Sequence, residues 1–497
     1  MPHGTPLDTR RGGVLLHVTS LPPTGPDTHE GGDLGAAARA FVDFLADAGC
    51  SVWQVLPLVP THLVDRSPYN AMSALALNPE LISVHDLVTQ ELLSPEVGRA
   101  VAAGTTTQAE ARDELARQWP DLLARDEALA ADYRAWCAEH AGWLDDYVHF
   151  VVLRESTGES WTEWPTGLRD RDPSALAEAL APLDHEVEAR RALQYVVDRQ
   201  WAALREYAEV RGVLIFGDLP IFVSLDSADV WAARDMFRLD AEGRPIEVTG
   251  VPPDYFAADG QRWNNPHYDW DRMADDGFAW WRRRIGRQRQ LFDLVRIDHF
   301  RGFEAAWHIP VDAPTAKEGR WESSPGREVL AALLDTAGEG TLVAEDLGTI
   351  TPGVLALRDE FGLPGMKVLQ FAFDGDPNNW YLPGAHGTRS VVYTGTHDND
   401  TTSGWWESLD DGTRQRVREN LLDGDEPMPW GLVRLAFAST ALLAVVPAQD
   451  LLGLGSDARM NTPGVDGGNW RWQAAPGAFT ATLAARLREL VESSDRA

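Results

Sequence analysis

Eight short apolar segments, separated by stretches with helical periodicity, are the feature that most limits how this chain can fold. They lie at residues 13–19, 51–58, 213–223, 294–300, 341–347, 365–373, 390–396 and 442–448. Stretches between several of them, such as 34–49, have the apolar spacing of an amphipathic helix. Strands that alternate with helices form parallel sheets, and eight such units close a barrel. The pattern predicts an α/β fold: a (β/α)8 TIM barrel with helical insertion subdomains and long active-site loops.

Two segments interrupt this alternation. Residues 85–210 are dominated by Ala, Leu, Glu and Arg at helical spacing, which predicts a mainly helical insertion with solvated charged faces. Residues 248–270 are rich in Pro, Gly, Asn and aromatics without a clear period, which predicts a long lid loop. We therefore expect residues 1–84 to form the first part of a catalytic barrel, 85–210 the insertion subdomain, and 211–497 the remainder of the barrel with its lid.

Charge and cysteine content narrow the possible partners. The chain has 44 Lys and Arg against 76 Asp and Glu, a formal charge of -32, which repels nucleic acid and anionic lipid and suits a neutral substrate. Its two cysteines, Cys50 and Cys137, form no disulfide or zinc pattern, and neither a signal region nor a membrane-spanning run is present. We expect a cytoplasmic protein, of an oligomeric state that the sequence does not indicate.

Polar residues follow the apolar segments at matching places. Asp218 lies within the third segment, Arg296 and Asp298 end the fourth, Glu345 ends the fifth, and Asp398 follows the seventh. The carboxyl ends of the strands of a TIM barrel meet at the mouth where active sites form. A set of carboxylates at these positions predicts a site for acid and base chemistry.

This residue set fits the cleavage of a glycosidic bond with retention. That reaction uses one ionised carboxylate as nucleophile and one protonated carboxyl as acid and later base. Arg296, two residues before Asp298 and on the same strand face, favours an ionised Asp298, whereas the apolar run before Glu345 favours a protonated acid. Asp398 and His397 are then expected to bind substrate hydroxyls, and Asp346 to point away by strand alternation.

Other readings of these residues are weaker but remain open. Tyr255, Phe256 and Trp263 in the predicted lid could cover a sugar, or could only pin the loop to the core. Clustered Asp and His could bind a metal, yet no HExxH or comparable spacing is present, so no metal ligand is predicted. The Gly-containing turn at 32–35 lacks the lysine of a phosphate-binding loop, so no nucleotide cofactor is predicted either.

Beyond this, the chain resembles the 4-alpha-glucanotransferases known as amylomaltases or disproportionating enzymes, glycoside hydrolase family 77. The resembling segments include 15–22 (LLHVTSLP), 53–58, 67–82, 217–231, 250–256, 296–304 (RIDHFRGFE), 344–354 (AEDLGTITPGV), 365–374, 393–402 (YTGTHDNDTT) and 460–472. The resemblance implies a nucleophile at Asp298, an acid/base at Glu345 and a third carboxylate at Asp398. It further implies substrate contacts by Tyr69, Asp218, Arg296, His397, Tyr255, Phe256 and Trp263.

The resemblance also implies the reaction. A segment of an alpha-1,4-glucan moves, through a covalent glucosyl-enzyme, to the 4-hydroxyl of glucose or another glucan, without cofactor or calcium. Maltooligosaccharides, alpha-1,4-glucans and glucose are the expected donors and acceptors.

The chain departs from the family's usual pattern in three places. Asn264 stands in WNNP where WGNP is usual, LPGAHG at 382–387 replaces a pattern with LPHN, and residues 61–69 vary a turn that usually contains Gly. A mainly hydrolytic alpha-glucanase and a non-enzymatic glycan-binding protein are the alternatives.

Overall fold

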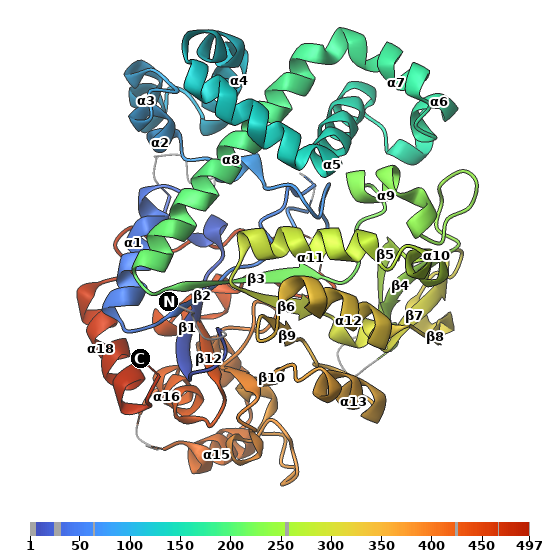
Figure 1. Cartoon of the computed structure of the whole chain (residues 1–497). Helices are drawn as coiled ribbons and strands as arrows, with labels where there is room; N and C mark the ends of the chain where they lie inside the picture. The colour runs from blue at the N-terminus through green and yellow to red at the C-terminus, as the bar shows by residue number, and fades with distance from the viewer. Residues whose placement is uncertain are drawn as a thin grey trace.

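A closed barrel of eight parallel strands forms the centre of the protein (Figure 1). The computed structural model describes residues 6–23, 31–62, 65–253, 258–422, 426–465 and 467–496. Around the barrel the strand order is β1-β12-β11-β10-β9-β6-β3-β2. Their bounds are Arg11–Leu15 (β1), Val52–Gln54 (β2), Leu214–Pro220 (β3), Leu294–Asp298 (β6), Leu342–Ala344 (β9), Gly365–Val368 (β10), Ser390–Tyr393 (β11) and Leu443–Pro447 (β12). Each strand lies within or overlaps one of the eight predicted apolar segments, so the predicted fold class is confirmed.

Buried side chains lie on both sides of the barrel wall because successive strand residues point to opposite faces. One set forms a cluster of its own that fills the barrel interior; it includes Leu15, Val52, Phe216, Leu294 and Val343. The alternate residues, such as Val14, Trp53 and Val295, pack against helices outside. Burial on both faces explains why the strands are nearly continuous apolar runs.

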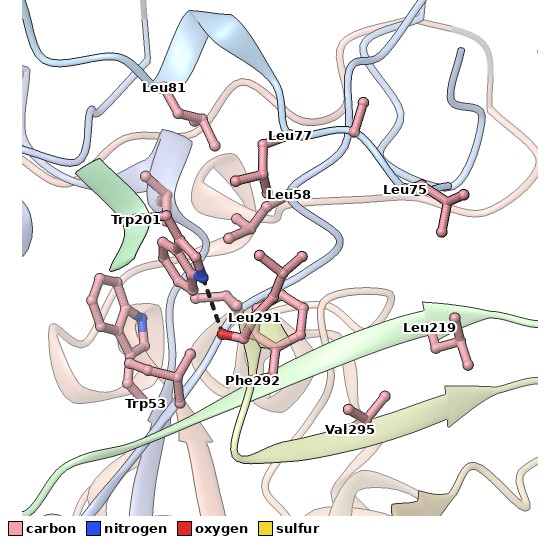
Figure 2. Close-up of a cluster of buried hydrophobic side chains, with 14 of the residues drawn as sticks. Trp53, Leu58, Leu75, Leu77, Leu81, Trp201, Leu219, Leu291, Phe292 and Val295 are labelled. Carbon is pink, nitrogen blue, oxygen red and sulfur yellow. Dashed lines mark hydrogen bonds between the residues drawn. The ribbon is translucent and has the colours of Figure 1, made fainter. Parts of the chain in front are cut away.

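Large side chains join the wall to its covering helices (Figure 2). Trp201, from α8 (Asp184–Val210), packs edge-on against Phe292, with ring centroids 5.8 Å apart, and donates a hydrogen bond from its indole to the backbone oxygen of Leu291, at 3.0 Å. Leu291 is the last residue of α11 (Ala279–Leu291), so this hydrogen bond joins α8 to the end of α11. An indole N–H that finds such an acceptor can be buried at little cost.

Helices connect most neighbouring barrel strands. The helices outside the predicted insertion are α1 (Ala36–Asp47), α9 (Ala228–Ala232), α10 (Trp270–Asp275), α11, α12 (Gly326–Ala337), α13 (Pro352–Glu360), α14 (Thr402–Ser408), α15 (Asp411–Asn420), α16 (Trp430–Ala438), α17 (Ala448–Leu451) and α18 (Ala481–Ser493). The connection from β10 to β11 contains only short 3-10 turns.

Between β2 and β3 the chain runs through a separate group of helices, at the top of Figure 1. They are α2 (Val84–Thr89), α3 (Pro95–Ala102), α4 (Gln108–Arg125), α5 (Glu127–Thr157), α6 (Thr166–Arg169), α7 (Pro173–Leu180) and α8. Helix α4 begins with a capping box, in which Thr107 and Glu110 bond each other's backbone N–H groups. The two long helices α5 and α8 pack along each other, and α4 packs against both of them.

A second sheet, four-stranded and antiparallel, stands beside the barrel. Its order is β5-β4-β7-β8, from Gln261–Pro266 (β5), Glu247–Val251 (β4), Ala305–Pro310 (β7) and Arg320–Ser323 (β8). The expectation of one long loop over 248–270 is therefore wrong. Polar residues and a register shift between Val248 and Gly250 hide the strand alternation in the sequence.

In the described part of the chain, no helix combines the length and the apolar character that crossing a bilayer requires.

Candidate active site

Strand register brings the predicted carboxylates together at one end of the barrel. Asp218 on β3 lies opposite Arg296 on β6. Ile297 lies opposite Ala344 on β9, so the next residues, Asp298 and Glu345, leave the two strands at the same level. The side chains come together because parallel barrel strands all end at this mouth.

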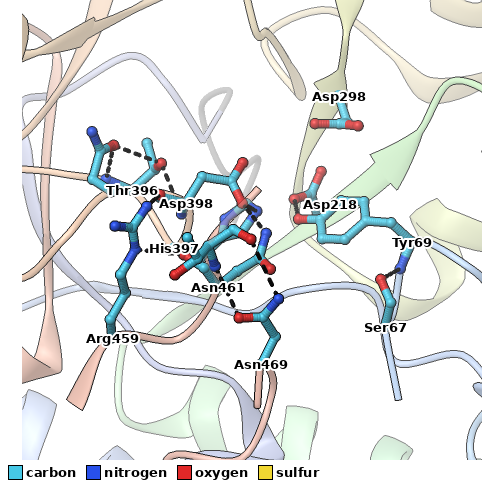
Figure 3. A network of polar contacts seen from close by, with 12 residues as sticks. Ser67, Tyr69, Asp218, Asp298, Thr396, His397, Asp398, Arg459, Asn461 and Asn469 are labelled. Carbon is cyan, nitrogen blue, oxygen red and sulfur yellow. Dashed lines mark hydrogen bonds and ion pairs between the residues drawn. The ribbon is translucent and has the colours of Figure 1, made fainter. Parts of the chain in front are cut away.

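Arg296 connects two of these carboxylates (Figure 3 draws Asp218 and Asp298). Its guanidinium contacts Asp218 Oδ2 at 2.6 Å and Asp298 Oδ1 at 2.8 Å, and only 4% of Arg296 is exposed. Although burial alone lowers the pKa of an arginine, the charges of Asp218 and Asp298 outweigh it and raise the pKa of Arg296 well above its usual value. The cation is thus permanent and holds Asp298 in a fixed orientation.

Glu345 is held by backbone groups. Its Oε2 accepts the N–H of His299 at 2.7 Å and its Oε1 accepts that of Leu347 at 2.8 Å. His299 has the left-handed φ of 50°, uncommon for a side chain of its size, and such conformations gather at functional sites. Two backbone donors at its oxygens fix the carboxyl of Glu345 next to Asp298.

Burial acts strongly on both carboxyls. It raises the pKa of Asp298 to about 8; Arg296 opposes the rise, while the charges of Asp218 and Glu345 add to it. Burial likewise raises the pKa of Glu345, against the effect of Arg296 and its two backbone donors. Because two nearby carboxyls titrate as a pair, this site retains a proton near neutral pH.

Asp398 lies across the mouth and is open to a ligand, with 44% of its side chain exposed. Its Oδ1 accepts a hydrogen bond from Asn461 at 2.6 Å and lies 3.3 Å from His397 Nε2 (Figure 3). Burial lowers the pKa of His397, so its ring is neutral. A neutral imidazole and an exposed carboxylate offer hydrogen bonds to uncharged hydroxyl groups.

Tyr69 links the two halves of the site. Its hydroxyl donates to Asp218 Oδ2 at 2.7 Å, and its ring stacks on His397 with centroids 5.2 Å apart and planes at 13°. Burial and the charge of Asp218 raise the pKa of Tyr69 well above its usual value, so it remains a donor. The contacts therefore run without a break from Asp298 through Arg296, Asp218 and Tyr69 to His397.

The three predicted lid aromatics have different outcomes. Trp263 lies on β5, half-buried, with its ring edge-on to His299 at 4.8 Å between centroids, and so stands beside the residue that binds Glu345. Tyr255 and Phe256 lie outside the described residues. Asp346, expected to be structural, pairs with Arg358 at 2.5 Å and accepts the N–H of Met366, away from the site.

Other side chains at this site carried no individual signal in the sequence. Asn461 binds Asp398, Arg459 donates to the backbone oxygen of Asp398, and Trp470 packs against both Tyr69 and His397. They follow β12 in an irregular segment, where neither periodicity nor spacing relates them to a strand end. Only the likeness of residues 460–472 to the family pattern pointed to this segment.

A cavity of about 160 Å³ adjoins Trp470. Its lining includes His17 from the end of β1, Arg66, Asn78, Glu80 and Trp470. Burial lowers the pKa of His17 to about 3, so this imidazole is neutral as well. The lining therefore combines charged, neutral polar and aromatic side chains, and such a mixture of convergent polar groups and apolar surface is typical of small-molecule sites.

Among the described residues, a group with the spacing of metal ligands lies away from the mouth, in the four-stranded sheet. Glu247, His308 and Glu322 bring their donor atoms within 4.8 Å of one another. Arg238 and Arg320 already pair with both carboxylates. Two cations in the same cluster repel a metal ion, and the group is best read as an ion-pair network.

Comparisons with known proteins agree with this geometry. A family model described as 4-alpha-glucanotransferase matches residues 16–478. The 4-alpha-glucanotransferase of Thermus thermophilus is 47% identical, over 97% of this chain and 98% of that protein. That of Synechocystis sp. is 44% identical, over 98% of each. The structure of the amylomaltase of Streptococcus agalactiae in complex with acarbose superposes with a TM-score of 0.91 at 33% identity, covering 98% of this chain and 99% of that one.

Proposed function

The chain belongs to the family of 4-alpha-glucanotransferases, glycoside hydrolase family 77, and from this premise we propose which of its residues carry the reaction. The activity is transfer of alpha-1,4-glucan segments with retention of configuration. The proposal concerns Asp298, Glu345 and Asp398 as the catalytic carboxylates. The observation that carries it is the Arg296 guanidinium, which contacts Asp298 and Asp218 at once while Glu345 is fixed beside them.

In the first step, Asp298 attacks the anomeric carbon of the donor. The glycosidic bond breaks, its electron pair goes to the leaving oxygen, and Glu345 gives that oxygen its proton. The raised pKa of Glu345, caused by burial, supports this role. Arg296 holds Asp298 by one oxygen, Oδ1, and the other oxygen would make the attack. The product is a glucosyl ester of Asp298 and a shortened glucan.

In the second step the roles of Glu345 reverse. The ionised carboxylate takes the proton from the 4-hydroxyl of an acceptor, whose oxygen attacks the anomeric carbon and releases Asp298. Water is a competing acceptor, so an acceptor glucan has to be positioned by binding. Trp263, beside His299, would exclude water on this side of the site.

The remaining polar residues bind the reacting glucose. Asp398 and His397 are proposed to bond its hydroxyls, more strongly as the ring flattens in the transition state. Tyr69 would provide the face against which this ring lies, and Asp218 keeps Tyr69 and Arg296 in place. Asn461 and Arg459 hold Asp398.

Maltooligosaccharides and glucose are the proposed donors and acceptors. Alpha-glucans as a class follow from family membership, and a small acceptor with several hydroxyl groups agrees with the hydrogen-bonding groups of Asp398 and His397. We also propose that the protein is cytoplasmic, supported by free thiols at buried Cys50 and half-buried Cys137.

The test is incubation of purified protein with maltotriose, following products and reducing ends. Transfer produces glucose and longer oligosaccharides at constant reducing ends. The variant Asp298→Asn is expected to lose at least about a thousandfold in rate, because it removes the nucleophile. The control Asp226→Asn changes a half-buried carboxylate that pairs with Arg154, and retains activity. Rising reducing ends without longer products, or an active Asp298→Asn, would overturn the proposal.

A further inference from the structure

A buried tyrosine inside the barrel has no part in the proposed mechanism. Tyr393 is the last residue of β11 and has no exposed surface. Its ring packs in the cluster that fills the barrel interior, together with Val391 of the same strand. Among the described residues, the Tyr393 hydroxyl has no hydrogen-bond partner. Because leaving a buried hydroxyl unpaired is costly, its place inside the barrel calls for an explanation.

Two other side chains that point into the barrel each have an unpaired oxygen. Phe216 and Val52 belong to the interior cluster. Asp218 and Gln54 follow them by two positions on β3 and β2, so strand alternation directs both inward. Asp218 is 1% exposed and Gln54 is 2% exposed. Within the described part of the chain, neither Asp218 Oδ1 nor Gln54 Oε1 has a hydrogen-bond partner.

The three unpaired atoms lie in the same part of the barrel interior. Strand β3 runs between β2 and β6, and Asp218 lies opposite Arg296. Alternate strands contribute side chains to one layer of a TIM barrel, and β11 and β3 are such strands. Burial raises the pKa of Tyr393 above its usual value. Arg296 and Gln54 oppose this rise, and the charge of Asp218 adds to it, so these groups surround the hydroxyl.

The donors and acceptors gathered here match one water molecule. Tyr393 offers an O–H donor, whereas the free oxygens of Asp218 and Gln54 are acceptors. Two acceptors do not bond each other, so each needs a donor from elsewhere. Water donates two hydrogen bonds and accepts from a third group, and buried waters make about three bonds. An ion fits less well, because Arg296 repels a cation and Asp218 an anion.

We propose that Tyr393, Gln54 and Asp218 bind a buried water molecule beneath the catalytic mouth, and that Tyr393 and Gln54 are positioning residues for the reaction. The water donates to Asp218 Oδ1 and to Gln54 Oε1. It accepts a hydrogen bond from the Tyr393 hydroxyl. Each of the three unpaired atoms then has a partner.

The water would act on the nucleophile through Asp218. Its other oxygen, Oδ2, is bound by Tyr69 and by Arg296. Arg296 in turn contacts Asp298 at 2.8 Å. With both oxygens bonded, the Asp218 carboxylate keeps one orientation, and so does the guanidinium that holds Asp298. This kinetic consequence rests on the proposed function, whereas the water site does not.

A high-resolution crystal structure of the wild-type protein tests the water site directly. We expect one ordered water at about 2.5–3.0 Å from the Tyr393 hydroxyl, Asp218 Oδ1 and Gln54 Oε1. The structure of Tyr393→Phe should lack this water. A Tyr393 hydroxyl that bonds either oxygen directly, with no water between them, would overturn the site.

Kinetics with maltotriose test the positioning role. Tyr393→Phe should lower kcat about 10-fold, the value of one hydrogen bond in a network that ends on a charge. KM should stay unchanged, because a fully buried hydroxyl does not touch the substrate. Gln54→Met should have a similar effect. The double variant should lose little more than either single variant, because each change already removes the water. An unchanged kcat, or losses that add in the double variant, contradicts the role.

Tyr147→Phe is the matched control. It removes the hydroxyl of a tyrosine that is 2% exposed, on α5 of the helical group, and should keep the wild-type kcat. An equal loss of kcat in this control would overturn the positioning role. Failure of the proposed function has a different signature: Asp298→Asn would transfer glucose units at the wild-type rate, while the ordered water would still be seen in the crystal.

Discussion

At the scale of single residues, the site depends on one buried cation shared by two carboxylates. Arg296 contacts Asp218 and Asp298 while almost fully buried. Removing one member of such a group is costly because it leaves a charge without its partner. The same scale explains a departure from the family pattern. Asn264 replaces the usual Gly at a φ of 64°, and Asn is among the residues that tolerate this region.

The raised pKa values of Asp298 and Glu345, which titrate as a pair, make stability depend on pH. Unfolded, the Asp298 carboxyl ionises near its ordinary pKa of about 3.9; in the folded pair, whose shared proton lies on Glu345 for the reaction, burial raises the pKa of Asp298 to about 8. The folded state therefore binds more protons between these values, and its contribution to stability is lost as the pH rises from about 4 to about 8. In Asp298→Asn the free energy of unfolding should decline less over this range. Urea titrations of both proteins across these pH values measure the difference; equal slopes would contradict the assignment.

At the scale of elements, the β4–β5 hairpin carries Trp263 to the mouth and is held at its base by ion pairs. Glu247, the first residue of β4, bonds Arg320, and lies 3.0 Å from His308 and 3.5 Å from Arg238. His308 in turn stacks on His267 with centroids 3.4 Å apart. The pairs tie β4 to β7 and β8, so the position of Trp263 depends on them.

Glu247→Gln is expected to weaken the ion pairs that hold the β4–β5 hairpin. The amide keeps the shape but removes the charge shared by two arginines, at a cost of about 1.5–3 kcal/mol. Transfer should slow as well, with KM rising, because the hairpin carries Trp263. Thermal unfolding and steady-state kinetics measure both effects.

Thr107→Ala serves as the comparison. It removes the N-cap of α4, in the helical group between β2 and β3, which should lower the free energy of unfolding by about 1 kcal/mol. Its kcat and KM should remain those of the wild type. If Glu247→Gln loses stability but keeps its KM, the hairpin does not position the site.

At the scale of the whole molecule, the two ends of the chain close the barrel. β1 pairs with β12, and Arg496, with no exposed surface, donates to the backbone oxygens of Phe437, Ser439 and Ala441. It also reaches the backbone oxygen of Arg11, where β1 begins. These contacts lie at the amino ends of the strands, opposite the mouth, where residues stabilise the barrel without taking part in catalysis.

Arg496→Met is expected to lower the melting temperature strongly, since each charged hydrogen bond contributes about 1.5–3 kcal/mol. kcat at low temperature should remain that of the wild type. Arg496→Lys keeps the charge but loses the planar set of donors of the guanidinium. Its melting temperature should lie between those of the wild type and Arg496→Met. Loss of kcat without loss of stability would contradict this expectation, because it would mean that contacts at the amino ends of the strands affect catalysis at the mouth.

The sequence by itself determined the barrel and the place of its carboxylates. Short apolar segments that alternate with amphipathic helices predict parallel strands under helices. Polar residues at the carboxyl ends of such strands then lie at the mouth, as Asp218, Asp298 and Glu345 do. The β4–β5 hairpin and the contacts of Asn461 and Trp470 were decided by tertiary structure. Each depends on contacts between segments distant in the chain, which leave no local period. The raised pKa of Asp298 is also a tertiary effect, because it comes from burial and from the nearby charges of Asp218 and Glu345.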